Sequence, residues 1–248
     1  MPEPRILVAS ALGKIIAPIL EEAIDGALVT AACQETDIER AIPNQMRFDA
    51  VLIDLTWNDY RLEKEFDGLD VLQLLRDTDR IAPVIFAAQG HGVEREHLEE
   101  AILQPEVKCL IQKADGKGPL IAAAQAVSYG LPVPKGAAAS LNQRSANSIY
   151  QFFTRPRNGP TLARIAGAIA TGRATDAESL ADATGYALNT VNKLTQQFGP
   201  MIKARGEHDE NLRLTAQVVY RWCGEHSCYI RSWCRRNGQA DVLGDAGS

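Results

Sequence analysis

Five short apolar runs alternate with five amphipathic segments in the first half of the chain, and this alternation constrains the fold more than any other feature. The apolar runs predict strands over Arg5–Ala9, Gly26–Ala32, Asp49–Leu55, Ala82–Ala88 and Val107–Lys113. Helical spacing follows each of them, over Ile15–Ala23, Asp37–Met46, Leu69–Arg76, Glu94–Leu103 and Leu120–Tyr129. Strands that alternate with helices form a doubly wound parallel sheet, so we predict an α/β domain over residues 1–135.

Charged residues lie at the carboxyl ends of two of these predicted strands. Asp54 ends the third strand, Asp67-Gly68 closes the loop after it, and Lys113 ends the fifth strand. Together with the last helix and its glycine, Leu120–Gly130, this order resembles the receiver domain of bacterial two-component response regulators over residues 4 to 135. The resemblance implies that Asp54 occupies the phospho-acceptor position and Lys113 the position of the phosphate-pairing lysine.

The chain departs from that family where the family holds Mg²⁺. Ala9 and Ser10 stand in place of two adjacent acidic residues, and Ala87 or Ala88 in place of a hydroxyl residue. Because Mg²⁺ needs carboxylate oxygens, we expect Asp54 to be inactive as an acceptor and to form a fixed ion pair with Lys113. Such a pseudo-receiver would signal by dimerisation, by a bound small molecule or by a partner protein, and the sequence does not choose among them.

The second half of the chain contains a short helix, a glycine and a second helix within Ala177–Gln196. Ala181, Gly185 and Val191 have the spacing at which a small residue, a left-handed turn and a branched apolar residue let two helices cross. Leu180 and Leu194 complete a small core. This spacing resembles the helix-turn-helix DNA-binding motif, in which the second helix enters the major groove.

The second predicted helix has two faces. Its apolar residues recur at three- and four-residue steps and are expected to point inward: Leu188, Val191, Leu194, Phe198 and Ile202. Asn192, Lys193 and Gln196 are candidates for base edges, because Asn and Gln bind adenine and Lys reaches guanine. The candidates for phosphate contacts are Asn189, Thr190, Arg205 and Arg213. The alternative is that this polar face is only solvated.

The residues after this helix predict a short hairpin. Met201–Arg205 and Leu212–Thr215 are strand-like and flank a turn-rich segment, which resembles the wing of a winged helix-turn-helix domain. Three acidic residues at the expected tip, Glu207, Asp209 and Glu210, would repel phosphate.

Composition divides the remaining chain. Residues 136–160 contain the Pro, Gly and small residues of a linker with a possible helix over Leu141–Phe153. The DNA-binding domain is predicted over 161–236, with one long C-terminal helix from Ala216 to Arg236, and a disordered tail over 237–248.

Zinc is disfavoured, because one continuous helix cannot bring its Cys and His side chains to one point: Cys223, His226, Cys228 and Cys234.

The distribution of charge and the cysteine content indicate the kind of partner and the cellular compartment. Residues 1–143 hold 13 basic and 22 acidic residues, a net charge of −9, whereas residues 144–236 hold 13 and 7, a net charge of +6. Positive charge therefore accompanies the helix-turn-helix, as in nucleic-acid-binding modules. The five unevenly spaced cysteines and the lack of a membrane-length apolar run favour the cytoplasm.

These features predict a cytoplasmic transcription regulator that binds double-stranded DNA as a homodimer. No glycine-rich phosphate loop or His-Glu-x-x-His motif occurs, so we expect neither an enzyme nor a cofactor. Three alternatives stay open: a conventional phosphorylation-switched regulator, an adaptor whose helix-turn-helix binds a protein and no longer binds DNA, and an RNA-binding antiterminator.

Overall fold

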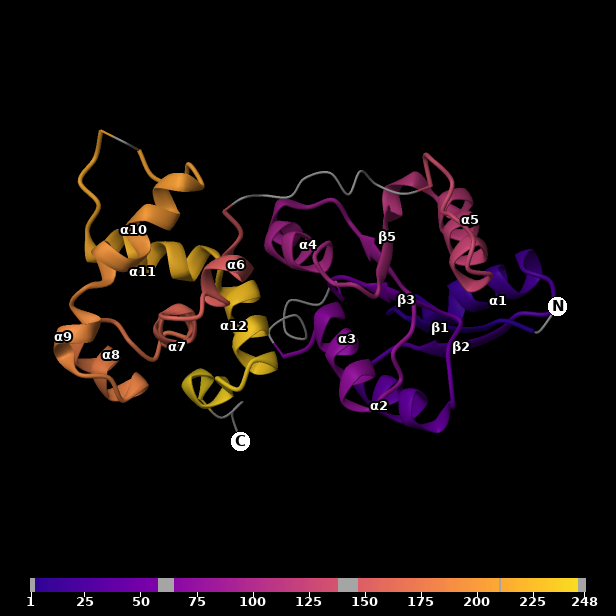
Figure 1. Ribbon diagram of the computed structural model, residues 1–248, viewed down its shortest axis with the longest axis horizontal. Helices are drawn as coiled ribbons and strands as arrows, with labels where there is room; N and C mark the ends of the chain where they lie inside the picture. Colours follow the sequence, from indigo (N-terminus) through magenta and orange to yellow (C-terminus); the bar gives the residue numbers. More distant parts are fainter. Residues whose placement is uncertain (1–2, 58–64, 138–146, 210, 245–248) are drawn as a thin grey trace. The chain divides into compact units, whose positions relative to one another are not determined.

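A computed structural model describes residues 3–57, 65–137, 147–209 and 211–244. The chain divides into two compact units, residues 1–144 and 145–248 (Figure 1). None of the helices in the described part of the chain is long and apolar enough to cross a membrane. All five cysteines are free thiols.

The N-terminal unit contains a five-stranded parallel sheet. Its strands are β1 (Arg5–Ala9), β2 (Leu28–Ala32), β3 (Ala50–Asp54), β4 (Val84–Ala88) and β5 (Val107–Gln112), in the order β2-β1-β3-β4-β5. Every neighbouring pair is parallel. The predicted doubly wound sheet is therefore confirmed.

Helices cover both faces of this sheet. They are α1 (Gly13–Ala23), α2 (Glu35–Asn44), α3 (Gly68–Asp77), α4 (Arg95–Ala101) and α5 (Lys117–Ser128), with short 3-10 helices η2 (Gly92–Glu94) and η3 (Lys113–Asp115). In Figure 1, α5 lies on one side of the strands and α2 and α3 lie on the other. Alternate strand residues such as Ile6, Val8 and Leu52 pack with Leu20 and Ala123 of α1 and α5, and bury one continuous core.

The C-terminal unit is helical. Its elements are α6 (Ile149–Phe153), α7 (Gly159–Ala170), α8 (Ala177–Thr184), α9 (Leu188–Val191), α10 (Leu194–Ala204), α11 (Ala216–Glu225), α12 (Ser227–Arg236) and η4 (Ala240–Leu243). The central α7 contacts α6, α8, α11 and α12. Edge-to-face aromatic pairs join α6 to the rest: Phe152 packs on Phe198 at 5.5 Å, and Phe153 packs on Trp233 at 5.3 Å between ring centroids.

The predicted wing is wrong. Residues 147–209 and 211–244 contain no strand, and the segment expected to be its first strand is the end of α10. Met201 and Ile202 are adjacent and both buried, which suits a helix and not a strand whose neighbours point to opposite faces. Leu212–Thr215 is an irregular segment that leads into α11.

Three further boundaries differ from the prediction. The helix expected to begin near Leu188 and continue past Gln196 is interrupted between α9 and α10. The long C-terminal helix is interrupted at His226, whose ring packs on Trp222 with centroids 4.7 Å apart. Within the tail expected to be disordered over 237–248, Ala240–Leu243 instead forms η4, in which Val242 is fully buried, and residues 245–248 lie outside the described part of the chain.

Candidate functional site

The carboxyl ends of the parallel strands bring Ser10, Asp54 and Lys113 together in the N-terminal unit. Ser10 Oγ donates to Asp54 Oδ2 at 2.7 Å, and Lys113 Nζ lies 2.9 Å from the same oxygen. Asp54 is 2% exposed, and its Oδ1 has no hydrogen-bond partner in the described part of the chain. Burial raises the pKa of Asp54, and it outweighs the opposing effects of Lys113 and Ser10. The expected pair with Lys113 is present in this arrangement.

A second carboxylate near this edge of the sheet, that of Glu94, accepts hydrogen bonds from backbone N–H groups. Glu94 Oε2 accepts from the N–H groups of Gln89 at 2.9 Å and Gly90 at 2.8 Å. Its Oε1 accepts from the hydroxyl of Thr56 at 2.9 Å. Glu94 therefore orders the turn after β4. Glu94 was not identified from the sequence. A usable signal was its place three residues after His91, the position from which an acidic side chain can accept from the backbone N–H groups at the start of a helix.

Gly68 explains why the Asp67-Gly68 pair follows the Asp54 strand. A Cβ atom at position 68 would collide with the carbonyl oxygen of Asp54 and come within 3.0 Å of Leu55 Cα. Asp67 caps α3 by accepting from Leu69 N–H at 2.8 Å, and the Asp67 N–H in turn donates to Asp70 Oδ2 at 2.8 Å. The loop is thus fixed directly against the end of β3.

The helix-turn-helix forms from local signals in the C-terminal unit. Asp176 caps α8 by accepting from Ser179 N–H at 2.8 Å. Gly185 ends α8 with φ +72°, a left-handed conformation that suits glycine, and its N–H donates to Ala181 O at 2.8 Å. Leu180 and Val191 are fully buried at the crossing of the helices. The predicted bend therefore has the expected geometry.

The candidate base-reading residues lie around the interruption between α9 and α10. Asn192, Lys193 and Gln196 are exposed, as is Asn189, whereas Thr190 is half-buried. Asn192 N–H still donates to Leu188 O at 2.9 Å, and Gln197 N–H donates to Lys193 O at 2.9 Å. Asn192 and Lys193 form the turn between the two helices and belong to neither of them. These amides and the ammonium group are available to a partner.

Two predictions for this face need correction. Leu188, expected to point inward, lies at the first position of α9 and is 44% exposed. Arg205, expected to contact phosphate, has a buried side chain. Its Nε donates to Glu207 Oε1 at 2.8 Å and its Nη1 to Asn147 O at 3.0 Å. Arg213, the other arginine candidate, is exposed.

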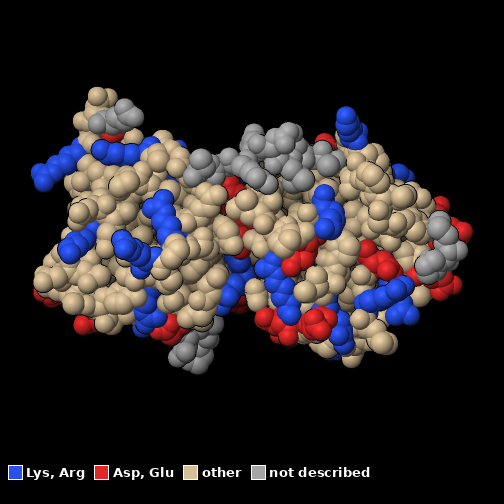
Figure 2. All heavy atoms as spheres, in the orientation of Figure 1, with Lys and Arg blue, Asp and Glu red and all other residues tan. Residues whose placement is uncertain are grey.

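Glu207, expected at the tip of a wing, is instead a structural acceptor. It accepts from Trp222 Nε1 at 2.7 Å, and His226 Nε2 lies 3.2 Å from the same carboxylate. Burial acts to raise its pKa, but His226, Trp222 and Arg205 together hold the pKa of Glu207 at about 2. The acidic residue therefore does not extend toward a nucleic acid. Figure 2 shows several separate Lys and Arg side chains on the visible face of this unit, among a larger area of other residues.

Among known proteins, the chain is similar to solved structures only. No family model matches the chain, and no curated protein matches it. The Salmonella typhimurium RcsB response regulator, studied for DNA interaction, is 14% identical, with 90% of this chain and 99% of that chain covered and a TM-score of 0.47. The response regulator StyR is 16% identical over 88% and 97% of the two chains, with a TM-score of 0.36. A Francisella response regulator receiver domain, 1452, is 21% identical over 52% and 98%, with a TM-score of 0.39.

Because each of these scores is below 0.5, the likenesses carry no argument about function. The fold assignment rests on the strand order and the helices of the chain itself.

Proposed function

We propose that the chain is a DNA-binding transcriptional regulator of the atypical response-regulator type. The observation that carries this proposal is the exposed polar set Asn192, Lys193 and Gln196, presented just beyond a left-handed glycine turn. Amide side chains and an ammonium group are the donors and acceptors that read base edges in the major groove. Asn189, Thr190 and Arg213 are proposed to contact phosphates.

The N-terminal unit is proposed to act without phosphorylation. A receiver resemblance implies Mg²⁺ beside Asp54, but the residues present do not fit that ion. Ala9 offers no ligand, Ser10 donates its hydroxyl proton to Asp54, and Glu94 is occupied by backbone N–H groups. One buried carboxylate does not supply the oxygen set that Mg²⁺ requires. Asp54 and Lys113 are therefore assigned a fixed structural role.

The partners follow from this assignment. The protein is proposed to act in the cytoplasm as a homodimer, with the N-terminal unit receiving a small-molecule or protein signal. Two copies related by a twofold axis would bind half-sites about one helical turn apart on double-stranded DNA.

Retention of genomic DNA fragments at moderate salt tests the proposal. Gln196→Ala and Lys193→Ala are expected to weaken specific binding by about tenfold each, because each removes a base contact of about 1–3 kcal/mol. Gln151→Ala is the matched control, since Gln151 is also an exposed helical glutamine but lies on α6. Wild-type affinity in both recognition variants would refute the assignment of these residues.

A separate experiment tests the phosphorylation-independent state. The protein incubated with acetyl phosphate and Mg²⁺ is expected to remain unlabelled. Stoichiometric labelling that disappears in Asp54→Asn would instead establish a conventional phosphorylation switch.

The exposure of Leu188 favours one alternative, a protein-binding adaptor. An apolar side chain on the same surface as Asn189 and Asn192 is suited to a protein interface. The adaptor function predicts that the protein retains no genomic DNA fragment, and that Leu188→Ala abolishes capture of its protein partner. The DNA-binding function predicts retention of DNA fragments, and fragment retention therefore separates the two.

A further inference from the structure

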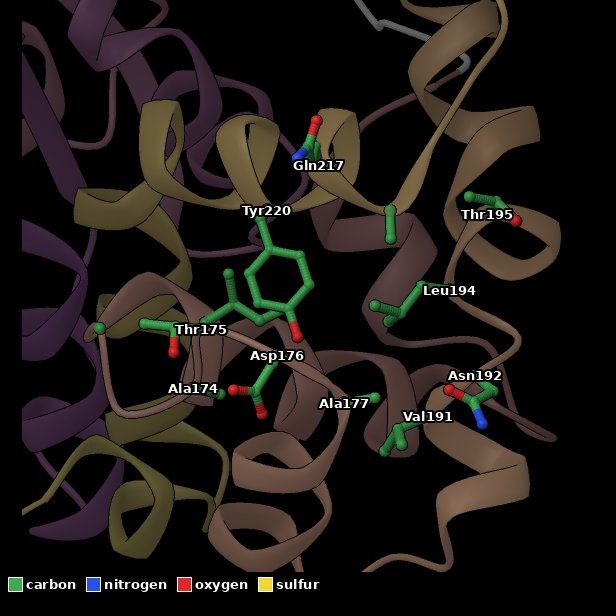
Figure 3. A pocket seen from close by; sticks show the side chains of 13 residues that line it. Ala174, Thr175, Asp176, Ala177, Val191, Asn192, Leu194, Thr195, Gln217 and Tyr220 are labelled. Atoms are coloured by element: carbon green, nitrogen blue, oxygen red, sulfur yellow. The ribbon is translucent and has the colours of Figure 1, made fainter.

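A cavity of about 560 Å³ lies within the C-terminal unit, next to the interruption between α9 and α10 (Figure 3). It is bordered by the end of α7, the start of α8 and the start of α11. Ile169, Ala174, Val191 and Leu194 provide apolar walls. Sites for small molecules are mostly apolar and commonly have volumes of roughly 300–1,000 Å³, so this cavity has the size and lining of such a site.

Two oxygen-bearing side chains, Tyr220 and the exposed Asp176, border this cavity. The hydroxyl oxygen of Tyr220 is buried and has no hydrogen-bond partner among the described residues. Figure 3 shows this hydroxyl directed toward Asp176. One oxygen of Asp176 already accepts from the Ser179 N–H and hydroxyl, both at 2.8 Å. A buried hydroxyl without a partner is unfavourable, and a ligand that supplies one would relieve it.

We propose that this cavity binds a small, mainly apolar amine whose ammonium group lies between the Tyr220 hydroxyl and the Asp176 carboxylate. An ammonium group donates several hydrogen bonds, so it can satisfy both oxygens while the apolar body contacts Val191 and Leu194. A carboxylate of similar size would be repelled by Asp176.

The charge state of the two groups supports this choice. Bonds from the Ser179 backbone and side chain lower the pKa of Asp176, which is therefore ionised at neutral pH. Burial raises the pKa of Tyr220, and the negative charge of Asp176 adds to the effect. The Tyr220 hydroxyl therefore lies in a negative potential, which favours a cation over an anion.

Occupancy of the cavity would regulate DNA binding, an inference that rests on the proposed function. Asn192 and Thr195 border the same cavity, and Asn192 is one of the candidate base-reading residues. A molecule held against Val191 and Leu194 would restrict the kink between α9 and α10. DNA affinity changes only if the ligand prefers one arrangement of that kink over the other.

Nuclear magnetic resonance titration of the full chain with phenethylamine tests the binding site. We expect saturable shifts at Val191, Thr195 and Tyr220, and weaker binding of 3-phenylpropanoate. Asp176→Asn keeps a helix cap but removes the charge, and Tyr220→Phe removes only the hydroxyl. Each substitution is expected to weaken phenethylamine binding by about threefold. Asp182→Asn, an exposed acid of α8 away from the cavity, is the control and is expected to bind as wild type.

Absence of saturable binding, equal binding of the carboxylate, or equal affinities of the Asp176 and Asp182 variants would overturn the amine site. The regulatory part is tested by DNA affinity with and without saturating phenethylamine. A change of at least about threefold is expected in the wild type, and Tyr220→Phe is expected to need about three times as much phenethylamine to reach half of that change. Unchanged DNA affinity would overturn the regulatory part. If the protein binds the amine but no DNA, the proposed function fails while the ligand site stands.

Discussion

The buried pair of Asp54 and Lys113 gives a quantitative prediction. Lys113→Met leaves the Asp54 carboxylate, 2% exposed, with Ser10 as its remaining donor. Breaking a fully buried pair costs about 3–5 kcal/mol, and because the Lys113 side chain is 19% exposed we expect the lower value, about 3 kcal/mol. In an Asp54→Asn background the same change removes one hydrogen bond and is expected to cost about 1 kcal/mol.

The raised pKa of Asp54 determines how the stability of the N-terminal unit should depend on pH. Because the folded-state pKa is raised, the stability contributed by this carboxyl is present at low pH and is lost as pH rises through the folded pKa. The charged carboxylate is therefore unfavourable at neutral pH. Asp54→Asn, which resembles the protonated carboxyl in shape and charge, is expected to change the unfolding free energy by less than about 1 kcal/mol.

Native-state hydrogen exchange of peptides that cover β3 and β5 measures these effects within the N-terminal unit. The four proteins are the wild type, the two single variants and the double variant. A coupling free energy of about 2 kcal/mol between positions 54 and 113 is expected. Equal costs of Lys113→Met in the two backgrounds would refute the reasoning, as would a loss of more than about 2 kcal/mol in Asp54→Asn.

Three other predictions concern the C-terminal unit. The pKa of Glu207 is lowered to about 2, so its stabilising contribution is present above about pH 4.5 and is lost as pH falls toward 2. In thermal melts over this range, Glu207→Gln should remove about 1 kcal/mol of that pH dependence, discounted for partial exposure, and an unchanged pH profile would contradict it. Gly185→Ala should lower the unfolding free energy by about 1 kcal/mol, because φ is +72° there, and a neutral result in urea denaturation would contradict the left-handed turn. Val242→Ala should cost about 2 kcal/mol in the same assay if η4 is packed as described, whereas a disordered tail would give no change.

The N-terminal fold was predictable because buried parallel strands are nearly continuous apolar runs. Val51, Leu52 and Ile53 are all buried. A strand covered on both faces has apolar residues at consecutive positions, so its sequence is easily recognised as a buried strand. The place of Asp54 and Lys113 at one edge followed from the parallel order. The bond from Ser10 to Asp54 did not, because it depends on a side-chain orientation that the spacing does not specify.

The helix-turn-helix was predictable from Gly185 and the residues around it, whereas the wing was not. Short segments such as Met201–Arg205 fit a strand or the end of a helix equally well in composition, and tertiary packing decides between them. Ile202 is buried with Phe198 one helical turn earlier, so the helix continues. Arg205 was assigned to a phosphate on that mistaken strand, and its burial follows from the same error.

Selection of bound sequences from a random duplex library tests the central claim most directly. The wild type is expected to enrich one motif, with two half-sites about one helical turn apart, and a combined Lys193→Ala and Gln196→Ala variant is expected to enrich none. No enrichment by the wild type, or the same motif from the variant, would contradict the claim that these side chains read DNA.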